Sequence, residues 1–257
     1  MLLAIDIGNT HTVFAAFAAA EIKHVWRLQS DKDQTADEFA ALLAPLLSAQ
    51  NLGFSDFDDV IIGSVVPGLG RAMMELCESY IKTTPIIVNH ETAGIDVALD
   101  LPDEVGADRL VNARAVLEHY SAPAIVIDFG TATTFDVISA AGAYSGGVIA
   151  PGVNLSLEAL SRAASKLPKI SLQKPEQATG VSTVSAMQSG AYWGYIGLIE
   201  KILDKLIAEI DGTPTILATG GLAKTFIGDL PVIKTIDQEL TLKGLYTIYK
   251  SRKNNEQ

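Results

Sequence analysis

The chain has 257 residues, of which 48% are hydrophobic and 19% charged, with a formal net charge of −11 and one cysteine, Cys77. This length is close to the limit for one hydrophobic core, so we expect two packed domains. The negative charge disfavours nucleic-acid binding, and a single cysteine excludes an intrachain disulfide. No apolar run is long enough to span a bilayer. We therefore expect a cytoplasmic protein that binds neither nucleic acid nor membrane.

The first half of the chain is predicted to alternate strands with helices. Residues 1–7, 12–18 and 22–29 are expected to form three strands, and 35–50 a helix capped by Thr35 or Asp33. Short strands are predicted at 60–65 and 85–88, with helices at 69–80 and 104–120. Such alternation indicates an α/β fold with parallel strand pairing.

The second half repeats this order. Strands are predicted at 123–128, 133–139 and 143–149, helices at 154–165 and 183–210, then a strand at 215–218 and a helix at 222–226. The repetition predicts a duplicated fold with domains at residues 1–117 and 118–250, followed by a frayed tail at 251–257.

Two similar turns stand about half the chain apart. Asp6-Ile7-Gly8-Asn9-Thr10 and Asp128-Phe129-Gly130-Thr131 each end a predicted strand in Asp-x-Gly followed by polar side chains. Glycine lets a phosphate approach the backbone, and the carboxylate could bind a cation. We therefore expect two facing turns in a nucleotide-binding cleft. A single Asp-x-Gly is also typical of ordinary hairpin turns, and Asp128 could equally cap turn amides.

A third polar motif begins the helix predicted at 104–120. The dipole of this helix favours an ionised Asp108, and the Arg109 guanidinium can hold a carboxylate or phosphate at two points. The alternative is an exposed acid and a surface ion pair. Thr219-Gly220-Gly221, between a strand and a helix, suits adenosine binding but is also typical of an ordinary loop.

The long helix predicted at 183–210 begins with a hydroxyl cap, Ser182 or Thr183. Its aromatic residues indicate a core face or a two-fold dimer interface; they are Tyr192, Trp193 and Tyr195. The four histidines lack metal-ligand spacing, and the chain contains neither a P-loop nor a protein-kinase glycine loop.

Taken together, the ordered motifs resemble the type III pantothenate kinase family. They are Asp6 to Thr10, Gly106-Ala107-Asp108-Arg109, Asp128 to Thr133, Gly146-Gly147-Val148-Ile149-Ala150-Pro151-Gly152 and Thr219-Gly220-Gly221. The resemblance implies the duplicated, ribonuclease H-like fold of acetate kinase, sugar kinases, Hsp70 and actin. It also implies a homodimer that transfers the γ-phosphate of ATP to pantothenate, giving 4'-phosphopantothenate in the first step of coenzyme A biosynthesis.

The resemblance also assigns residues to ligands. ATP with Mg²⁺ would bind at Asp6, Ile7, Gly8, Asn9, Thr10, His11, Thr12, Val13 and Thr131, with Asp6 as the magnesium ligand, directly or through water. Asp128 would hold K⁺ or NH₄⁺. Pantothenate would contact Gly106, Ala107, Asp108, Arg109 and Thr183, and Asp108 would accept the proton of its primary hydroxyl.

Three positions depart from the family pattern. Leu99 stands where the family usually has a tyrosine, so a hydrogen bond to substrate would be lost, while His11 and Ala15 replace a frequent asparagine and glycine. Two other functions stay open: a nucleotide-binding regulatory or accessory protein, and a kinase for another small hydroxylated acceptor. Asp108 favours an enzyme, because a protein that only binds nucleotide does not need a proton acceptor.

Overall fold

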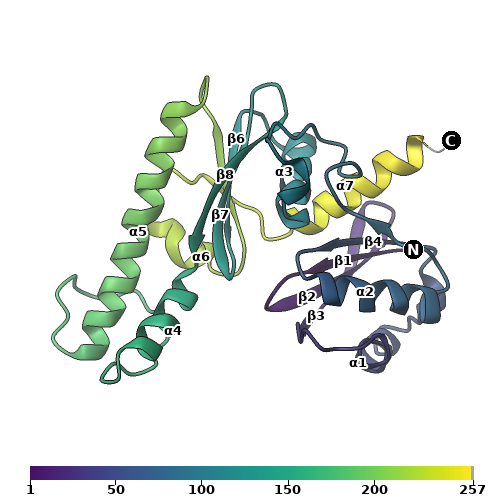
Figure 1. Ribbon diagram of the computed structural model, residues 1–257, viewed down its shortest axis with the longest axis horizontal. Coiled ribbons are helices and arrows are strands. Elements are labelled where there is room, and N and C mark those ends of the chain that lie inside the picture. Colours follow the sequence, from purple (N-terminus) through teal and green to yellow (C-terminus); the bar gives the residue numbers. More distant parts are fainter. Residues whose placement is uncertain (256–257) are drawn as a thin grey trace. The chain divides into compact units, whose positions relative to one another are not determined.

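The computed structural model describes residues 1–255 and divides them into two compact units (Figure 1). The first unit contains residues 1–120 and the C-terminal segment from residue 239, and the second contains residues 121–238. The division at residue 120 lies close to the predicted boundary at 117. In the described part of the chain, no helix combines the length and apolar character needed to cross a membrane.

The first unit is built on a five-stranded sheet. Its strands are β1 (Leu2–Ile7), β2 (His11–Ala18), β3 (Glu21–Gln29), β4 (Asp59–Ser64) and β5 (Ile86–Ile87), in the order β3-β2-β1-β4-β5. The first three strands form the antiparallel meander expected from their alternating residues, and β4 and β5 add in parallel. All five predicted strands of this half are therefore confirmed.

One face of this sheet is covered by α1 (Ala36–Ser48) and by α2 (Pro67–Leu76), which continues as a π-helix over Cys77–Ile81. Thr35 is the N-cap of α1, and its side chain accepts from the backbone N–H of Glu38. The core on this face joins Ile5, Phe14 and Phe39, all fully buried. Short 3₁₀ turns at Phe54–Asp56 and Pro102–Glu104 lie in the connecting segments.

The C-terminal helix α7 (Leu240–Asn255) corrects two sequence predictions. It belongs to the first unit, not to a domain at 118–250, and it lies against α3 (Ala107–His119) (Figure 1). A Cβ on Gly244 would lie 2.1 Å from the carbonyl oxygen of Val111, so the two helices cross at a distance that only glycine permits. Lys253 Nζ lies 2.8 Å from an Asp59 carboxylate oxygen. The predicted tail at 251–257 is therefore helical to residue 255, and residues 256–257 lie outside the described part.

The second unit repeats the architecture of the first. Its sheet contains β6 (Ala124–Phe129), β7 (Ala132–Ile138), β8 (Tyr144–Pro151), β9 (Thr215–Thr219) and β10 (Thr235–Ile236), in the order β10-β9-β6-β7-β8. Antiparallel and parallel pairs follow the same sequence as in the first sheet, so the duplication is confirmed. The helices are α4 (Val153–Ala163), α5 (Thr183–Glu209) and α6 (Ala223–Phe226), followed by a 3₁₀ turn at Ile227–Asp229. Residues of α5 and α6 bury the face that carries Ile125, Ile127 and Phe129.

Candidate active site

The first polar turn joins β1 to β2. The backbone N–H of Gly8 donates to the carbonyl oxygen of His11 at 3.0 Å, and a Cβ on Gly8 would lie 3.2 Å from that oxygen. The turn is therefore tight, and glycine suits it. Asn9, Thr10 and His11 are exposed, whereas Thr12 is fully buried. The turn thus presents polar groups to a ligand at the end of a buried strand.

Asp6 lies beside this turn, as the penultimate residue of β1, and is partly buried. Strand pairing puts it in one row with Gly63 of β4 and with Val13 and Arg27 of the two strands on its other side. Burial, and to a smaller extent the Asp108 carboxylate, raise the pKa of Asp6 to about 7, against the opposing effect of the Arg27 guanidinium. The Asp108 carboxylate therefore lies near enough, within the first unit, to act on the charge of Asp6.

A pair of carboxylates that is costly to ionise is suited to bind a hard cation. Carboxylate oxygens are preferred ligands of Mg²⁺, and a bound cation offsets both the desolvation and the repulsion between two acids. Asp6, under the influence of Asp108, thus suits a hard divalent cation such as Mg²⁺.

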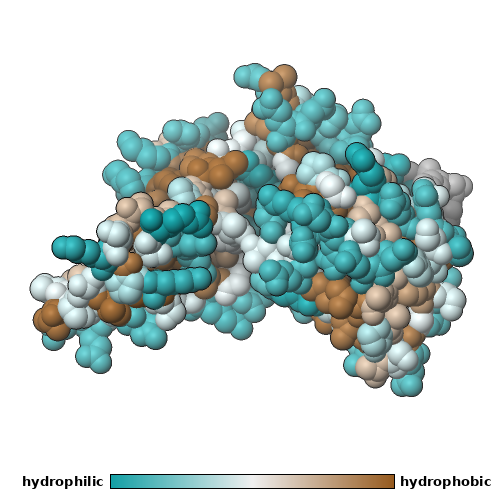
Figure 2. All heavy atoms as spheres, turned by 60° about the horizontal axis from the view of Figure 1, so that its bottom comes forward, coloured by the Kyte–Doolittle hydropathy of each residue, from teal (hydrophilic) through white to brown (hydrophobic). Residues whose placement is uncertain are grey.

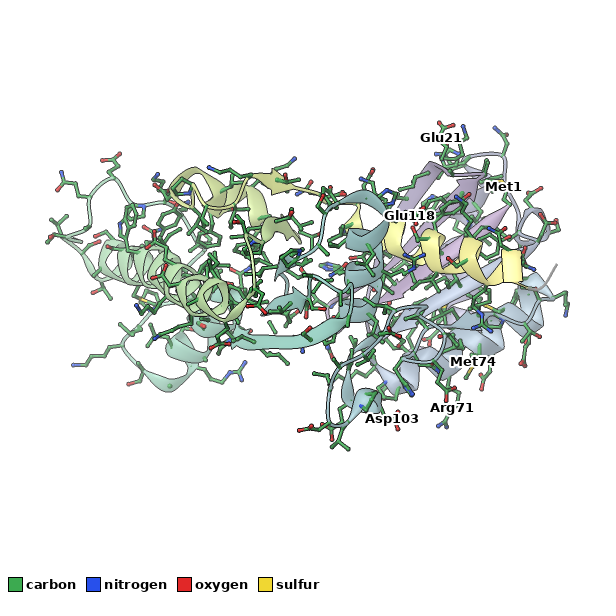
Figure 3. All side chains as sticks on the ribbon, turned by 90° about the horizontal axis from the view of Figure 1, so that it is seen from above. Met1, Glu21, Arg71, Met74, Asp103 and Glu118 are labelled. Atoms are coloured by element: carbon green, nitrogen blue, oxygen red, sulfur yellow. The ribbon has the colours of Figure 1, made fainter. Side chains whose placement is uncertain are left out.

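Asp108 is held at the start of α3 by local backbone geometry. The N-cap residue Gly106 is extended, and the backbone N–H of Arg109 donates to Asp108 Oδ1 at 2.8 Å. A Cβ on Gly106 would lie 2.6 Å from the same oxygen, so the carboxylate rests against the glycine Cα. In Figure 3, Asp103 lies just before this end of α3 and Glu118 marks the opposite end.

The pKa of Asp108 moves in the direction opposite to the one expected from the helix start. The helix dipole and Arg109 favour the ionised carboxylate, but burial has the larger effect and raises the pKa. The raised pKa makes the Asp108 carboxylate a better proton acceptor.

The second polar turn lies in the second unit, where Asp128 is paired in register with Thr134 of β7 and Thr219 of β9. Gly220 has a φ of +88°, and a Cβ there would lie 2.5 Å from Asp128 Oδ1. A Cβ on Gly152 would lie 2.3 Å from the carbonyl oxygen of Thr131. The glycines of the two later motifs therefore allow their loops to close on Asp128 and Thr131.

Comparison with known proteins identifies the family. The family model of type III pantothenate kinase matches residues 2–205. The chain belongs to the type III pantothenate kinase family. Relatives of this name from Paramagnetospirillum magneticum and Rhodospirillum rubrum are 48% and 47% identical to it, and both alignments cover 97% of this chain and at least 97% of the relative.

Solved structures support the fold alone. The activator of the 2-hydroxyisocaproyl-CoA dehydratase from Clostridium difficile, with bound ADPNP, has a TM-score of 0.58 at 12% identity, covering 99% of this chain and 97% of that one. A Campylobacter jejuni protein assigned to the Baf family of transcriptional activators has a TM-score of 0.61 at 20% identity, covering 98% and 99%. The duplicated ribonuclease H-like fold predicted from the sequence is thereby confirmed.

Thr183, the remaining residue that the pantothenate kinase resemblance assigns to substrate, lies in the second unit at the start of α5. Ser182 is the N-cap of α5 and accepts from the backbone N–H of Ser185 at 3.1 Å, and the neighbouring Thr183 is exposed. Thr183 lines an apolar groove of about 680 Å³ between α4 and α5. Tyr192 and Tyr195 are buried in the core, whereas Trp193 is 37% exposed.

Sequence reasoning missed Arg27, whose charge acts on Asp6. The signal was present in the strand alternation, because pairing of β1, β2 and β3 places Asp6, Val13 and Arg27 in one row, but the register had to be known. Leu99 lies partly buried in the segment before the 3₁₀ turn at Pro102–Glu104.

Proposed function

We propose that this chain uses ATP to phosphorylate pantothenate, forming ADP and 4'-phosphopantothenate as the first step of coenzyme A biosynthesis. The observation that carries the proposal is the influence of the Asp108 carboxylate on the buried Asp6, in a chain of the type III pantothenate kinase family. One acid beside a glycine turn and a second at a helix start provide separate groups for the phosphate donor and the acceptor.

The residues from Asp6 to Val13 bind the phosphates of ATP in this proposal. Gly8 lets the backbone approach the phosphate oxygens, and exposed Asn9, Thr10 and His11 provide donors around them. Asp6 holds Mg²⁺, directly or through water. A magnesium ion held there would neutralise charge on the group that is transferred.

Asp108 orients the primary hydroxyl of pantothenate and accepts its proton. Phosphoryl transfer has a loose transition state, so the base must mainly be well placed, and it can take the proton late. Contact with Gly106 and the bond from the Arg109 N–H fix the position of the Asp108 carboxylate. The Arg109 guanidinium binds the pantothenate carboxylate, and Ala107 and Thr183 complete the contacts with pantothenate.

In the second unit, Asp128 holds a monovalent cation, K⁺ or NH₄⁺, and Thr131 contacts ATP. The close approach of Gly220 to Asp128 supports this assignment, since the carboxylate lies directly against the glycine backbone. In a titration from 0 to 100 mM KCl, K⁺ should activate the wild-type enzyme about tenfold at saturation. Asp128→Asn should remove most of this activation. Activation that stays at the wild-type level would place the cation elsewhere.

We also propose that a second copy of the chain covers the groove between α4 and α5. Ala186, Gly190 and Gly194 recur every four residues along the groove, so a second helix can approach α5 closely. Leu160, which lines the groove, is exposed, and α4 and α5 carry three more exposed apolar side chains, Leu155, Val184 and Trp193. Figure 2 shows apolar patches, in brown, among hydrophilic areas on the face that it presents.

Light scattering after gel filtration tests the dimer. Gly190→Glu should convert a dimer into a monomer, because it places a charge in the apolar contact. Lys201→Glu, an exposed position on the same helix, is the matched control. A wild-type monomer, or a Gly190→Glu dimer of unchanged affinity, would contradict this interface.

The activity is tested with purified protein, ATP, Mg²⁺, K⁺ and pantothenate. ADP release should accompany a product with the mass of 4'-phosphopantothenate, and short hydroxy acids and sugars should react poorly. Asp108→Asn should lower kcat about a hundredfold or more while ATP still binds. Asp103→Asn is the matched control, since its side chain is 85% exposed. If ADP is released only with another acceptor, that acceptor is the substrate instead of pantothenate. An unchanged kcat in Asp108→Asn would show that Asp108 is not the base.

A further inference from the structure

We infer that Ser30 is a positioning residue for the turn that binds ATP. Ser30 follows the last residue of β3 and belongs to none of the motifs shared with the family. Its hydroxyl and its backbone N–H hold two carbonyl groups of the turn at residues 8–11, which sets the direction of the neighbouring N–H groups. The inference rests on the proposed binding of ATP phosphates at this turn.

Three hydrogen bonds join Ser30 to the turn. Ser30 Oγ donates to the carbonyl oxygen of Gly8 at 2.7 Å, and the Ser30 backbone N–H donates to the carbonyl oxygen of Thr10 at 3.0 Å. The hydroxyl groups of Ser30 and Thr12 lie 3.0 Å apart. A carbonyl oxygen only accepts, so the single Ser30 hydroxyl hydrogen is committed to Gly8, and the Thr12 hydroxyl must donate to Ser30.

At the Thr12 end of this hydrogen-bond network, water cannot compete for the donors and acceptors. Thr12 has no exposed surface, and Ser30 is partly buried. Hydrogen bonds among such groups hold their partners in one orientation, because a broken bond would leave a buried donor or acceptor unsatisfied.

Because each peptide unit is planar, these bonds also fix the directions of the N–H groups that face the phosphates. In a trans peptide, the C=O and the N–H of the same unit point to opposite sides, and the peptides of the turn are trans. With the Gly8 carbonyl held by Ser30, the Asn9 N–H points away from Ser30. With the Thr10 carbonyl held, the His11 N–H does so too. Two N–H groups of one turn that are fixed on the same side in this way can both face an anion.

Glycine makes this control necessary. Gly8 has the widest choice of backbone conformations of any residue in the turn, so its carbonyl could rotate without a steric penalty if nothing held it. The Ser30 hydroxyl removes that freedom before ATP binds. The triphosphate then does not have to order the turn, which improves its affinity without any direct contact from Ser30.

Three variants of Ser30 test the inference. Ser30→Ala should weaken binding of MgATP, measured calorimetrically with a non-hydrolysable analogue, about tenfold. Thr and Val are nearly equal in size, so Ser30→Thr should stay close to wild type while Ser30→Val weakens binding as alanine does. The KM for pantothenate should change less than twofold in all three. Ser55→Ala, at an exposed position of the same unit, is the control.

Gly8→Val in the same assay separates the two levels of the proposal. If Gly8→Val abolishes MgATP binding but Ser30→Ala and Ser30→Val bind normally, Ser30 does not position the turn although ATP binds there. If none of these variants changes the affinity, ATP does not bind at this turn and the proposed placement fails. Equal losses of MgATP affinity in Ser30→Thr and Ser30→Val would show that the size of the side chain matters rather than its hydroxyl, and would also overturn the inference. If Ser30→Ala fails to fold, the comparison of Ser30→Thr with Ser30→Val still tests the inference.

Discussion

Replacement of Asp6 by asparagine should stabilise the free protein while it abolishes activity. Burial and the nearby Asp108 raise the pKa of Asp6 from 3.8 to about 7, so the folded protein bears an unfavourable carboxylate at neutral pH. Asparagine has nearly the same shape and no charge. Asp6→Asn therefore removes the unfavourable interaction, together with the proposed ligand of Mg²⁺.

The size of the effect follows from the pKa shift. A difference of about 3 pKa units corresponds to on the order of 4 kcal/mol at pH 8, as an upper bound for one group. Because the folded-state pKa lies above the unfolded value, the folded protein binds more protons between about pH 4 and pH 7, and its free energy of unfolding falls as the pH rises through this range. At pH 5 the gain from Asp6→Asn should therefore shrink to about 2 kcal/mol.

Urea denaturation at pH 8 and pH 5 without nucleotide measures this gain. Trp26 is buried in the first unit and Trp193 lies in the second, so fluorescence in a Trp193→Phe background reports on the unit that contains Asp6. Asp103→Asn, an exposed acid of the same unit, should change the free energy of unfolding by less than about 0.5 kcal/mol. A loss of stability in Asp6→Asn at pH 8, or an equal gain at both pH values, would refute the electrostatic reasoning.

Three further predictions follow from the site and its support. Mg²⁺ and a proton compete for Asp6, so calorimetry should show Mg²⁺ affinity about tenfold lower at pH 6 than at pH 8. Gly106→Ala should lower kcat on the order of a hundredfold with little change in Tm, because the new Cβ displaces only the Asp108 carboxylate. Gly244→Ala should cost about 3 kcal/mol in denaturant unfolding followed through Trp26, because its Cβ meets the backbone of Val111.

Controls make these outcomes decisive. Gly53→Ala introduces a Cβ whose nearest neighbours are 3.9 Å away, so both kcat and stability should stay at the wild-type level. Magnesium affinity that is constant from pH 6 to pH 8 would contradict the assignment of the metal to Asp6. A Gly106→Ala enzyme of normal kcat would show that the carboxylate can move without loss, and a Gly244→Ala protein of normal stability would show that α3 and α7 separate easily.

The C-terminal helix shows why one part of the fold could not be predicted. One side of α7 lies on α3 and another on β1 and β4, and Tyr246 stacks on Phe17 with ring centroids 5.1 Å apart. Its apolar residues are therefore spread around the helix instead of forming the single stripe by which a surface helix is recognised. Contacts with residues far away in the sequence place α7 in the first unit, and no local sequence pattern indicates them. The two-residue strand β10 is too short to give any periodic signal.

The sequence by itself determined the alternation of strands and helices, the two Asp-x-Gly turns and the helix start that carries Asp108. These features depend on local periodicity and turn chemistry, which neighbouring residues specify. Only the tertiary structure decided the pairing of Asp6 with Asp108, the hold of Ser30 on the first turn and the return of α7 to the first unit. It also reversed the expected direction of the Asp108 pKa, because desolvation depends on which surfaces meet and exceeds the effect of the helix dipole.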